Sequence, residues 1–116
     1  MAKSKNHIRF PGRILIVGFG CIGRAVLPLL LRHTGLGPER IRIVTDKSTH
    51  RDIAEEYRVG IRVEKVTPEN YRRILSEELK AGDFLLNLSI GISSVELISW
   101  CREAGVLYLD ACIEPW

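Results

Sequence analysis

The segment from Arg13 to Ala25 reads RILIVGFGCIGRA, and it decides the fold of the chain. A run of apolar residues leads directly into Gly18-x-Gly20-x-x-Gly23, and apolar residues at helical spacing follow. In a strand–turn–helix unit, the first glycine allows a tight turn and the second lets a pyrophosphate approach the backbone. The third lets the helix pack closely on the strand. The free N–H groups and the positive dipole end of that helix then face the phosphates, so the segment predicts a dinucleotide site.

The second feature of this site is acidic. Asp46 ends the next predicted strand, 23 positions after Gly23. A carboxylate at this position accepts hydrogen bonds from the adenosine ribose and repels a 2′-phosphate, which favours NAD over NADP. Lys47 and Arg51 lie nearby and keep NADP open as an alternative. Asp46 could also be a turn residue that caps the following helix, and the two roles are compatible.

Five predicted strands alternate with four predicted helices. The strands cover residues 13–17, 41–45, 61–66, 84–88 and 106–109, and the helices cover 21–33, 51–58, a stretch from 68 that stops before 81–83, and 94–104. Right-handed crossovers then give an α/β fold, a Rossmann-like doubly wound parallel sheet in the order 3-2-1-4-5 with helices on both faces. We expect residues 1–12 to be a flexible lead-in and residues 13–116 to form one NAD-binding domain, with the ligand over the carboxyl ends of strands one and four.

Several local details follow from the residue pattern. The helix over 21–33 is expected to turn Ile22, Ala25, Val26, Leu29 and Leu30 inward, and to bend or loosen at Pro28. The third strand alternates and should lie near an edge. Thr67 is expected to cap the third helix with Pro68 at its first position, and Ser93 begins a capping box with Glu96.

Composition limits the classes of function. A length of 116 residues allows one domain, and the shares of hydrophobic (46%) and charged (27%) residues are ordinary for a globular protein. The net charge of +3 is spread along the chain. The densest group of basic residues is Lys3, Lys5 and Arg9 near the N-terminus. It has few aromatic neighbours, which favours a solvated tail, so no nucleic-acid partner is expected.

The cysteines and the apolar segments bear on location. Cys21, Cys101 and Cys112 have no metal-ligand spacing, and their odd number and apolar settings favour reduced thiols in a cytoplasmic protein without a metal. No segment is long or apolar enough to span a membrane, and the basic N-terminus lacks the apolar run of a secretory signal.

Polar residues at the expected carboxyl edge are candidates for further contacts. The cofactor-binding candidates are Gly18, Phe19, Gly20, Cys21, Ile22, Gly23, Asp46, Asn87 and Ser89. Asn87 and Ser89 either contact the pyrophosphate or nicotinamide side, or simply satisfy the strand end and the turn, and the residues leave both readings open. Asp110 and Glu114 could bind a cationic substrate, although the residues alone slightly favour solvation. No catalytic constellation can be assembled from His7, His33 and His50.

Several stretches resemble homospermidine synthase. They are residues 16–24, Leu27-Pro28-Leu29, Arg32-His33, Asn87-Leu88-Ser89, residues 107–110 and Glu114-Pro115-Trp116. The resemblance extends from Arg13 to the last residue. Pro28 inside the first helix and the Glu-Pro-Trp ending are far more specific than the glycine pattern.

The resemblance implies a Rossmann enzyme of the saccharopine dehydrogenase-like group that uses tightly held NAD as a hydride carrier. In that family, putrescine or the aminobutyl group of spermidine is oxidised to an imine. A second putrescine exchanges with the amine, and re-reduction gives homospermidine. The resemblance further implies that Glu114 lies at the polyamine site, and it raises the expectation of a homodimer.

Members of that family are several times longer and carry a second, catalytic domain. We therefore expect this chain to be an amino-terminal portion that contains no catalytic residues and, alone, turns over nothing. A free-standing NAD-sensing regulatory domain is the alternative. A methyltransferase is disfavoured, because its cofactor has no pyrophosphate to occupy the end of the helix.

Overall fold

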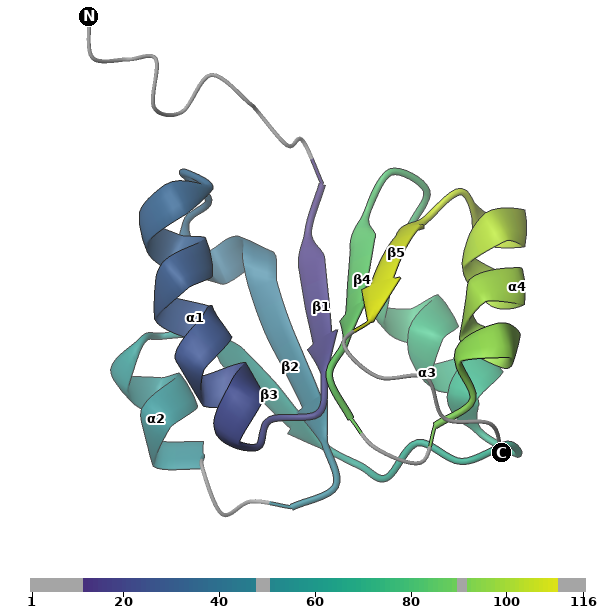
Figure 1. The fold of residues 1–116 in the computed structure, drawn as a ribbon, viewed down its shortest axis with the longest axis horizontal. Coiled ribbons are helices and arrows are strands. Elements are labelled where there is room, and N and C mark those ends of the chain that lie inside the picture. The colour runs from purple at the N-terminus through teal and green to yellow at the C-terminus, as the bar shows by residue number, and fades with distance from the viewer. Residues whose placement is uncertain (1–11, 48–50, 90–91, 111–116) are drawn as a thin grey trace, which may run out of the picture.

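The structure is a computed structural model that describes residues 12–47, 51–89 and 92–110. Its centre is a five-stranded sheet with the strand order β3-β2-β1-β4-β5, and each neighbouring pair is parallel (Figure 1). The strands are β1 (Ile14–Val17), β2 (Ile41–Thr45), β3 (Gly60–Val63), β4 (Phe84–Asn87) and β5 (Leu107–Asp110). The predicted fold class and strand order are confirmed.

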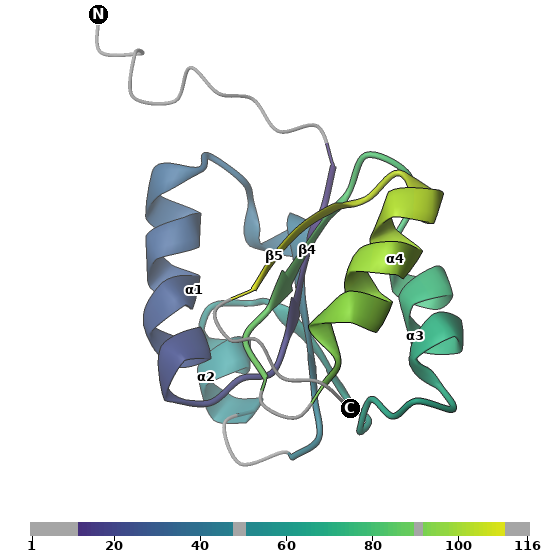
Figure 2. The same ribbon diagram turned by 45° about the vertical axis from the view of Figure 1, so that its right-hand side comes forward.

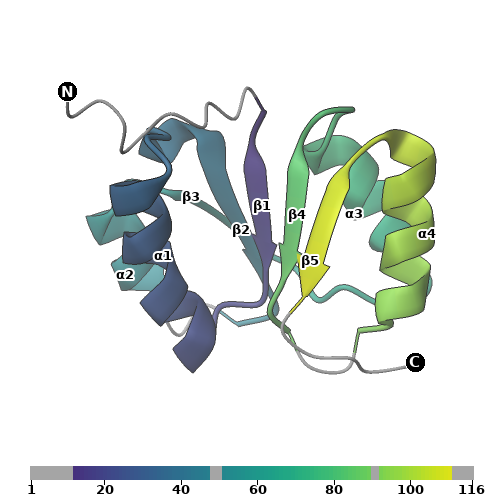
Figure 3. The same cartoon turned by 45° about the horizontal axis from the view of Figure 1, so that its top comes forward.

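Two pairs of helices enclose the sheet. Helices α1 (Cys21–His33) and α2 (Arg51–Glu56) cover one face, and α3 (Tyr71–Glu78) and α4 (Ser94–Ala104) cover the other (Figure 2). A short 3-10 helix, η2 (Pro38–Arg40), leads into β2. Figure 3 shows the strands side by side between the two helical layers, with all their arrowheads toward the same edge.

The central strand supplies both hydrophobic cores. All four residues of β1 are buried. Ile14 and Ile16 pack in the core under α1 and α2, whereas Leu15 and Val17 pack in the core under α3 and α4. A strand buried on both faces needs an unbroken apolar run, which is why β1 could be recognised from the sequence.

The two outer strands differ. Strand β3 lies at one edge of the sheet, as predicted. Its Arg62 forms ion pairs with Glu77 and Glu78 of α3 and with Glu64 in the loop after β3. In β5, Leu107 and Leu109 are 56% and 57% exposed. They pair in register with Phe84 and Leu86, which belong to the core under α1 and α2.

The predicted inward face of α1 was partly wrong. Leu27 is fully buried, but Leu29 is 52% exposed and Ala25 is exposed as well. Val26 and Leu30 do pack against the core, and the Ile22 side chain lies outside the described residues. Leu27 follows Gly23 by one helical turn, so the face that carries the glycine, rather than the densest apolar run, meets the sheet.

Helices α1 and α3 each differ from the prediction in one further detail. Helix α1 continues through Pro28 to His33, so the expected early loosening does not occur. Helix α3 begins at Tyr71 with Asn70 as its N-cap, so Thr67 is not the cap. The Thr67 amide donates to Asn70 Oδ1 (2.7 Å) and the Asn70 amide donates to Thr67 Oγ1 (3.2 Å), which makes a separate turn before the helix. This turn replaces the first helical turn that the sequence suggested.

Other elements end a few residues away from their predicted boundaries. Strand β3 ends at Val63, so residues 64–67 form a loop, and α2 ends at Glu56. Helix α4 has its predicted bounds and cap: Ser93 Oγ accepts from the Glu96 amide at 3.2 Å, and Gly105 ends the helix in the left-handed conformation with φ +75°.

Candidate nucleotide-binding site

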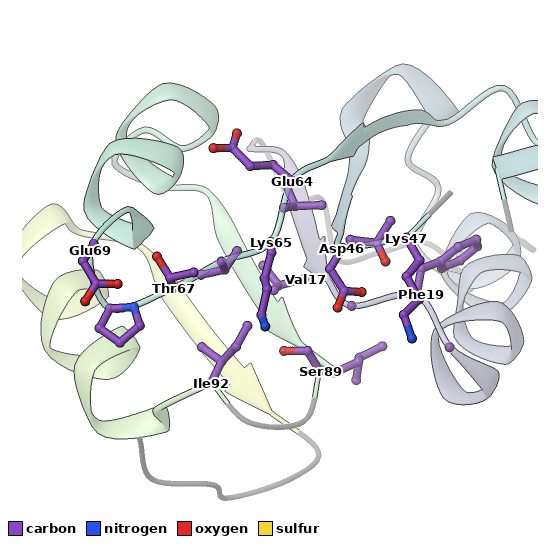
Figure 4. Close-up of a pocket in the computed structure, with 17 residues that line it drawn as sticks. Val17, Phe19, Asp46, Lys47, Glu64, Lys65, Thr67, Glu69, Ser89 and Ile92 are labelled. Atoms are coloured by element: carbon purple, nitrogen blue, oxygen red, sulfur yellow. The ribbon is translucent and has the colours of Figure 1, made fainter. Parts of the chain in front are cut away.

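A cleft of about 880 Å³ opens at the carboxyl edge of the sheet (Figure 4). Four segments line it: the end of β1 with the glycine turn, the end of β2, the loop after β3, and the segment after β4. The lining residues are Val17, Gly18, Phe19, Gly20, Val44, Thr45, Asp46, Lys47, Glu64, Lys65, Val66, Thr67, Pro68, Glu69, Leu88, Ser89 and Ile92. Its volume falls in the range of small-molecule and cofactor sites.

Gly18 is required by both backbone conformation and space. Its φ of +94° lies in a region that residues with side chains rarely adopt. Its amide donates to the carbonyl oxygen of Val44 at 2.7 Å, which fixes the turn to β2. A Cβ atom here would lie 2.7 Å from Cα of Ser89, so the glycine allows the two loops beside the switch point to touch.

Gly20 borders open space. A Cβ atom added there would meet no heavy atom within 4 Å, and the residue lines the cleft. Gly20 is also the N-cap of α1, where it supplies no side-chain hydrogen bond to the first turn. The backbone N–H groups at the start of α1 are therefore available to an anion.

At the start of α4, by contrast, the backbone N–H groups are not free to bind an anion. Both helices follow strands of the same parallel sheet, so both begin at the carboxyl edge. Ser93 caps α4 and Glu96 places a carboxylate in its first turn. Helix α1 has no acidic residue in its first turn and, among the described residues, no side-chain cap. Of these two helix ends, only that of α1 is suited to phosphate.

Asp46 follows β2 and lines the cleft as an exposed residue. Within the described part of the chain, no hydrogen bond or ion pair engages its carboxylate. Figure 4 shows this carboxylate directed into the open cleft near Ser89. An unengaged carboxylate beside an uncapped helix end is the arrangement that ribose and pyrophosphate groups require.

The two polar residues after β4 have different positions. Asn87 is 1% exposed and does not line the cleft. Its Nδ2 donates to the Tyr108 hydroxyl (3.1 Å), and its Oδ1 accepts from the amide (3.2 Å) and the hydroxyl (2.9 Å) of Ser89. Only Ser89 reaches the cleft. Asn87 lies beneath it and fixes its position.

The same network reaches the end of β5. The Tyr108 hydroxyl donates to Asp110 Oδ2 at 2.9 Å, and burial raises the pKa of Tyr108 to about 12. Asp110 is thus held by a tyrosine and is only half-exposed, in contrast to the solvated carboxylate favoured from the sequence. Glu114, the expected polyamine contact, lies outside the described residues.

The remaining candidates are located only in part. Cys21, Ile22 and Gly23 form the first turn of α1, but their side chains lie outside the described part of the chain. Cys101 is buried, and its desolvation raises the pKa of the thiol to about 12. Among residues 12–47, 51–89 and 92–110, no three potential metal ligands cluster, and no helix could cross a membrane.

One wall of the cleft was not predicted from the sequence. Lys65, Thr67 and Glu69 line it from the loop after β3, and Ile92 lines it from the start of the α4 segment. The carboxyl ends of parallel strands share one edge, so residues after β3 were candidates by the same reasoning that selected Asp46. The sequence predicts a third strand to residue 66 and a third helix that begins at Thr67 and Pro68, which leaves no loop between them, whereas β3 ends at Val63 and α3 begins at Tyr71.

The fold and cleft define a class: α/β nucleotide-binding domains with a glycine turn at the switch point of a parallel sheet. Within this class, the chain belongs to the family of the saccharopine dehydrogenase NADP binding domain, whose pattern matches residues 14–115. The family resemblance expected from the sequence is confirmed.

Individual relatives are similar over nearly the whole chain. Homospermidine synthase of Mesorhizobium japonicum is 38% identical over 108 residues, which cover 90% of this chain and 22% of that protein. The synthase of Blastochloris viridis is 38% identical over 111 residues, 93% of this chain and 23% of that protein. A crystal structure of the Legionella pneumophila enzyme in complex with NAD superposes with a TM-score of 0.90 at 39% identity, covering 96% of this chain and 24% of that one. The chain spans about a quarter of the length of these relatives.

Proposed function

We propose that this chain is the NAD-binding domain, residues 13–116, of a homospermidine synthase. The observation that carries the proposal is its similarity to a homospermidine synthase solved with NAD, together with a cleft of suitable size at the switch point of the sheet. In the complete enzyme, bound NAD would take a hydride from the polyamine and return it to the imine formed by amine exchange. This chain would supply the cofactor site.

The residues of the cleft fit the parts of the cofactor. The backbone N–H groups of Gly20 and the first turn of α1 would bind the pyrophosphate, because no side-chain cap among the described residues competes there. Gly18, whose own amide donates to Val44, would shape the turn around it. Asp46 would accept hydrogen bonds from the adenosine ribose. Ser89 would contact the pyrophosphate side, with Asn87 as its positioning residue. Phe19, Cys21, Ile22 and Gly23 complete the proposed turn.

Calorimetric titration of the purified chain with NAD, NADP and adenosylmethionine tests the proposal. We expect NAD to bind and adenosylmethionine not to bind. Asp46→Ala should weaken NAD binding roughly 10- to 100-fold, because a carboxylate–hydroxyl hydrogen bond contributes about 1.5–3 kcal/mol. Glu103→Ala is the matched control, since Glu103 is an exposed acid on α4 that does not line the cleft. Absence of NAD binding by a folded chain would overturn the proposal.

For the longer protein we propose putrescine as substrate, Glu114 as a contact for its ammonium group, a homodimeric assembly and a cytoplasmic location. The names of the relatives support the substrate class, and the buried Cys101 thiol is consistent with a reducing compartment. A putrescine turnover assay and a light-scattering mass on the full-length protein test these points separately.

A further inference from the structure

Two lysines flank Asp46 at the cleft. Lys47 is its neighbour in the chain, and Lys65 comes from the loop after β3, the adjacent strand. Figure 4 shows the Asp46 carboxylate between the two lysine side chains, with both ammonium groups on the open side of the cleft. Within the described residues, neither ammonium group takes part in an ion pair or hydrogen bond.

The other acids of the cleft do not neutralise these lysines. Glu64 is engaged by Arg62 (2.9 Å) and Arg73 (2.5 Å), and their hydrogen bonds, that of Arg73 first, lower its pKa. Figure 4 places Glu69 at the far end of the cleft, with Thr67 between it and Lys65. Asp46 is therefore the acid nearest to both ammonium groups in this part of the cleft.

The backbone of Lys65 is fixed at this position. The Glu64 amide donates to the carbonyl oxygen of Thr45 at 2.8 Å, which ties the loop to the residue just before Asp46. The carbonyl oxygen of Lys65 accepts from Asn70 Nδ2 at 2.9 Å. The two lysines thus emerge from neighbouring, mutually bonded strand ends, on either side of the expected ribose position.

We propose that Lys47 and Lys65 form a latent site for the 2′-phosphate of NADP, which Asp46 keeps closed. A 2′-phosphate lies where the ribose 2′-hydroxyl would meet Asp46, and the carboxylate repels it. Without that carboxylate, two ammonium groups would face a phosphate dianion, which is the pairing that phosphate sites use. The choice between NAD and NADP then depends on one charge. This inference rests on the proposed binding of the dinucleotide in the cleft.

The test compares NAD, NADP and ADP-ribose by calorimetry on the wild-type chain and on Asp46→Asn, which removes the charge and keeps the shape. We expect the wild type to prefer NAD. In the variant, NAD binding should weaken about 10-fold and NADP binding should tighten at least 10-fold. Adding Lys47→Gln and Lys65→Gln to that variant should remove most of the gain for NADP, leaving only the part that comes from relieved repulsion, and should leave NAD binding as in Asp46→Asn. Each lysine substitution made singly in the Asp46→Asn variant measures how much that lysine contributes to the gain in NADP affinity.

Lys80→Gln is the matched control, because Lys80 is exposed at the opposite edge of the sheet, beside the start of β4. In the Asp46→Asn background it should leave NADP binding unchanged. The latent site is overturned if NADP affinity does not rise in Asp46→Asn, or if the rise is undiminished after loss of both lysines. Failure of the proposed function looks different: the folded wild type would then bind neither NAD nor ADP-ribose.

Discussion

Asp83 and Asp46 lie at opposite edges of the same sheet and have opposite surroundings. Asp83 precedes β4 at the amino edge and is 6% exposed. Its Oδ1 accepts from the Arg13 amide (2.9 Å), and its Oδ2 accepts from the Lys80 amide (2.8 Å). Asp46 follows β2 at the carboxyl edge, is exposed, and has no partner for its carboxylate among the described residues.

The difference is the one expected between an acid that supports the fold and an acid that is available to a ligand. Asp83 ties β1 to the turn between α3 and β4, because both of its carboxylate oxygens accept hydrogen bonds from backbone amides. Asp46 keeps its capacity for a ligand. The amino edge of the sheet is closed by internal bonds, whereas the carboxyl edge leaves a helix end and a carboxylate open. Stability and binding should therefore respond to different aspartates.

The largest effect is expected from Asp83→Ala. The substitution leaves two backbone N–H groups without their charged acceptor, and each such bond contributes about 1–2 kcal/mol. We expect a loss of about 3 kcal/mol in the free energy of unfolding, which lowers Tm by roughly 10–20 °C in a domain of this size. Urea and thermal unfolding followed by circular dichroism measure it.

The affinity of the folded fraction for NAD should stay near the wild-type value in that variant, because Asp83 is remote from the cleft. Asp83→Asn, which keeps one acceptor oxygen, should lose less than Asp83→Ala. A loss below about 1 kcal/mol for Asp83→Ala would show that the amino edge is not held as the geometry indicates.

An intermediate effect is expected at Glu78, whose carboxylate is saturated by side chains instead of backbone. It accepts from Arg42 Nε (2.6 Å) and from Arg62 Nη1 (3.0 Å), and its side chain is 8% exposed. Glu78→Gln should cost about 1–2 kcal/mol at neutral pH, since two arginines lose their charged partner and only one acceptor oxygen remains. Glu77→Gln is the control, because Glu77 also binds Arg62 but is 49% exposed, and its loss should be smaller.

The pH dependence of Glu78→Gln has a defined sign. Burial raises the pKa of Glu78, but hydrogen bonds from Arg42 and Arg62 outweigh it and leave the pKa below its ordinary value of 4.5. The unfolded chain therefore binds this proton at higher pH than the folded chain, and stability falls on acidification. The gap between wild type and Glu78→Gln should be complete above about pH 4.5 and should close as the pH drops further. Equal gaps at pH 7 and pH 3 would contradict this.

The fold could be predicted because its determinants are local. The apolar run of β1, the glycine turn and the cap of α4 each act within a few residues. The loop between β3 and α3 could not be predicted, because Val66 is apolar and continues the alternation of the strand. Val66 is instead buried in the core under α3 and α4, in a loop held by the Glu64–Thr45 backbone bond. Tertiary contacts, rather than propensity, end that strand at Val63.

The candidate site divides in the same way. The glycines and Asp46 could be selected because their spacing follows from one strand–turn–helix unit and the next strand. Lys65 was missed because the predicted third strand extends to residue 66, whereas the observed strand ends at Val63 and its pairing with β2 brings the loop that carries Lys65 beside Asp46. Nothing in the sequence marks Asp83 as a structural acid, since the bond that its Oδ1 accepts from the Arg13 amide spans 70 positions. Pattern reasoning finds residues that one segment positions and misses those that two segments share.

The smallest effect on stability is expected from Asp46→Ala, the variant for which we expect a large effect on NAD binding. Its carboxylate supports no other described group, so the free energy of unfolding should change by less than about 0.5 kcal/mol. Any small loss should come from Lys47 and Lys65 losing a nearby opposite charge, and it should vanish near 1 M salt, where screening acts within about 3 Å. Thermal unfolding at 0.05 and 1 M sodium chloride separates the two cases. A loss above 1 kcal/mol that persists at high salt would mean that Asp46 caps the helix after it, and the two aspartates would then both be structural.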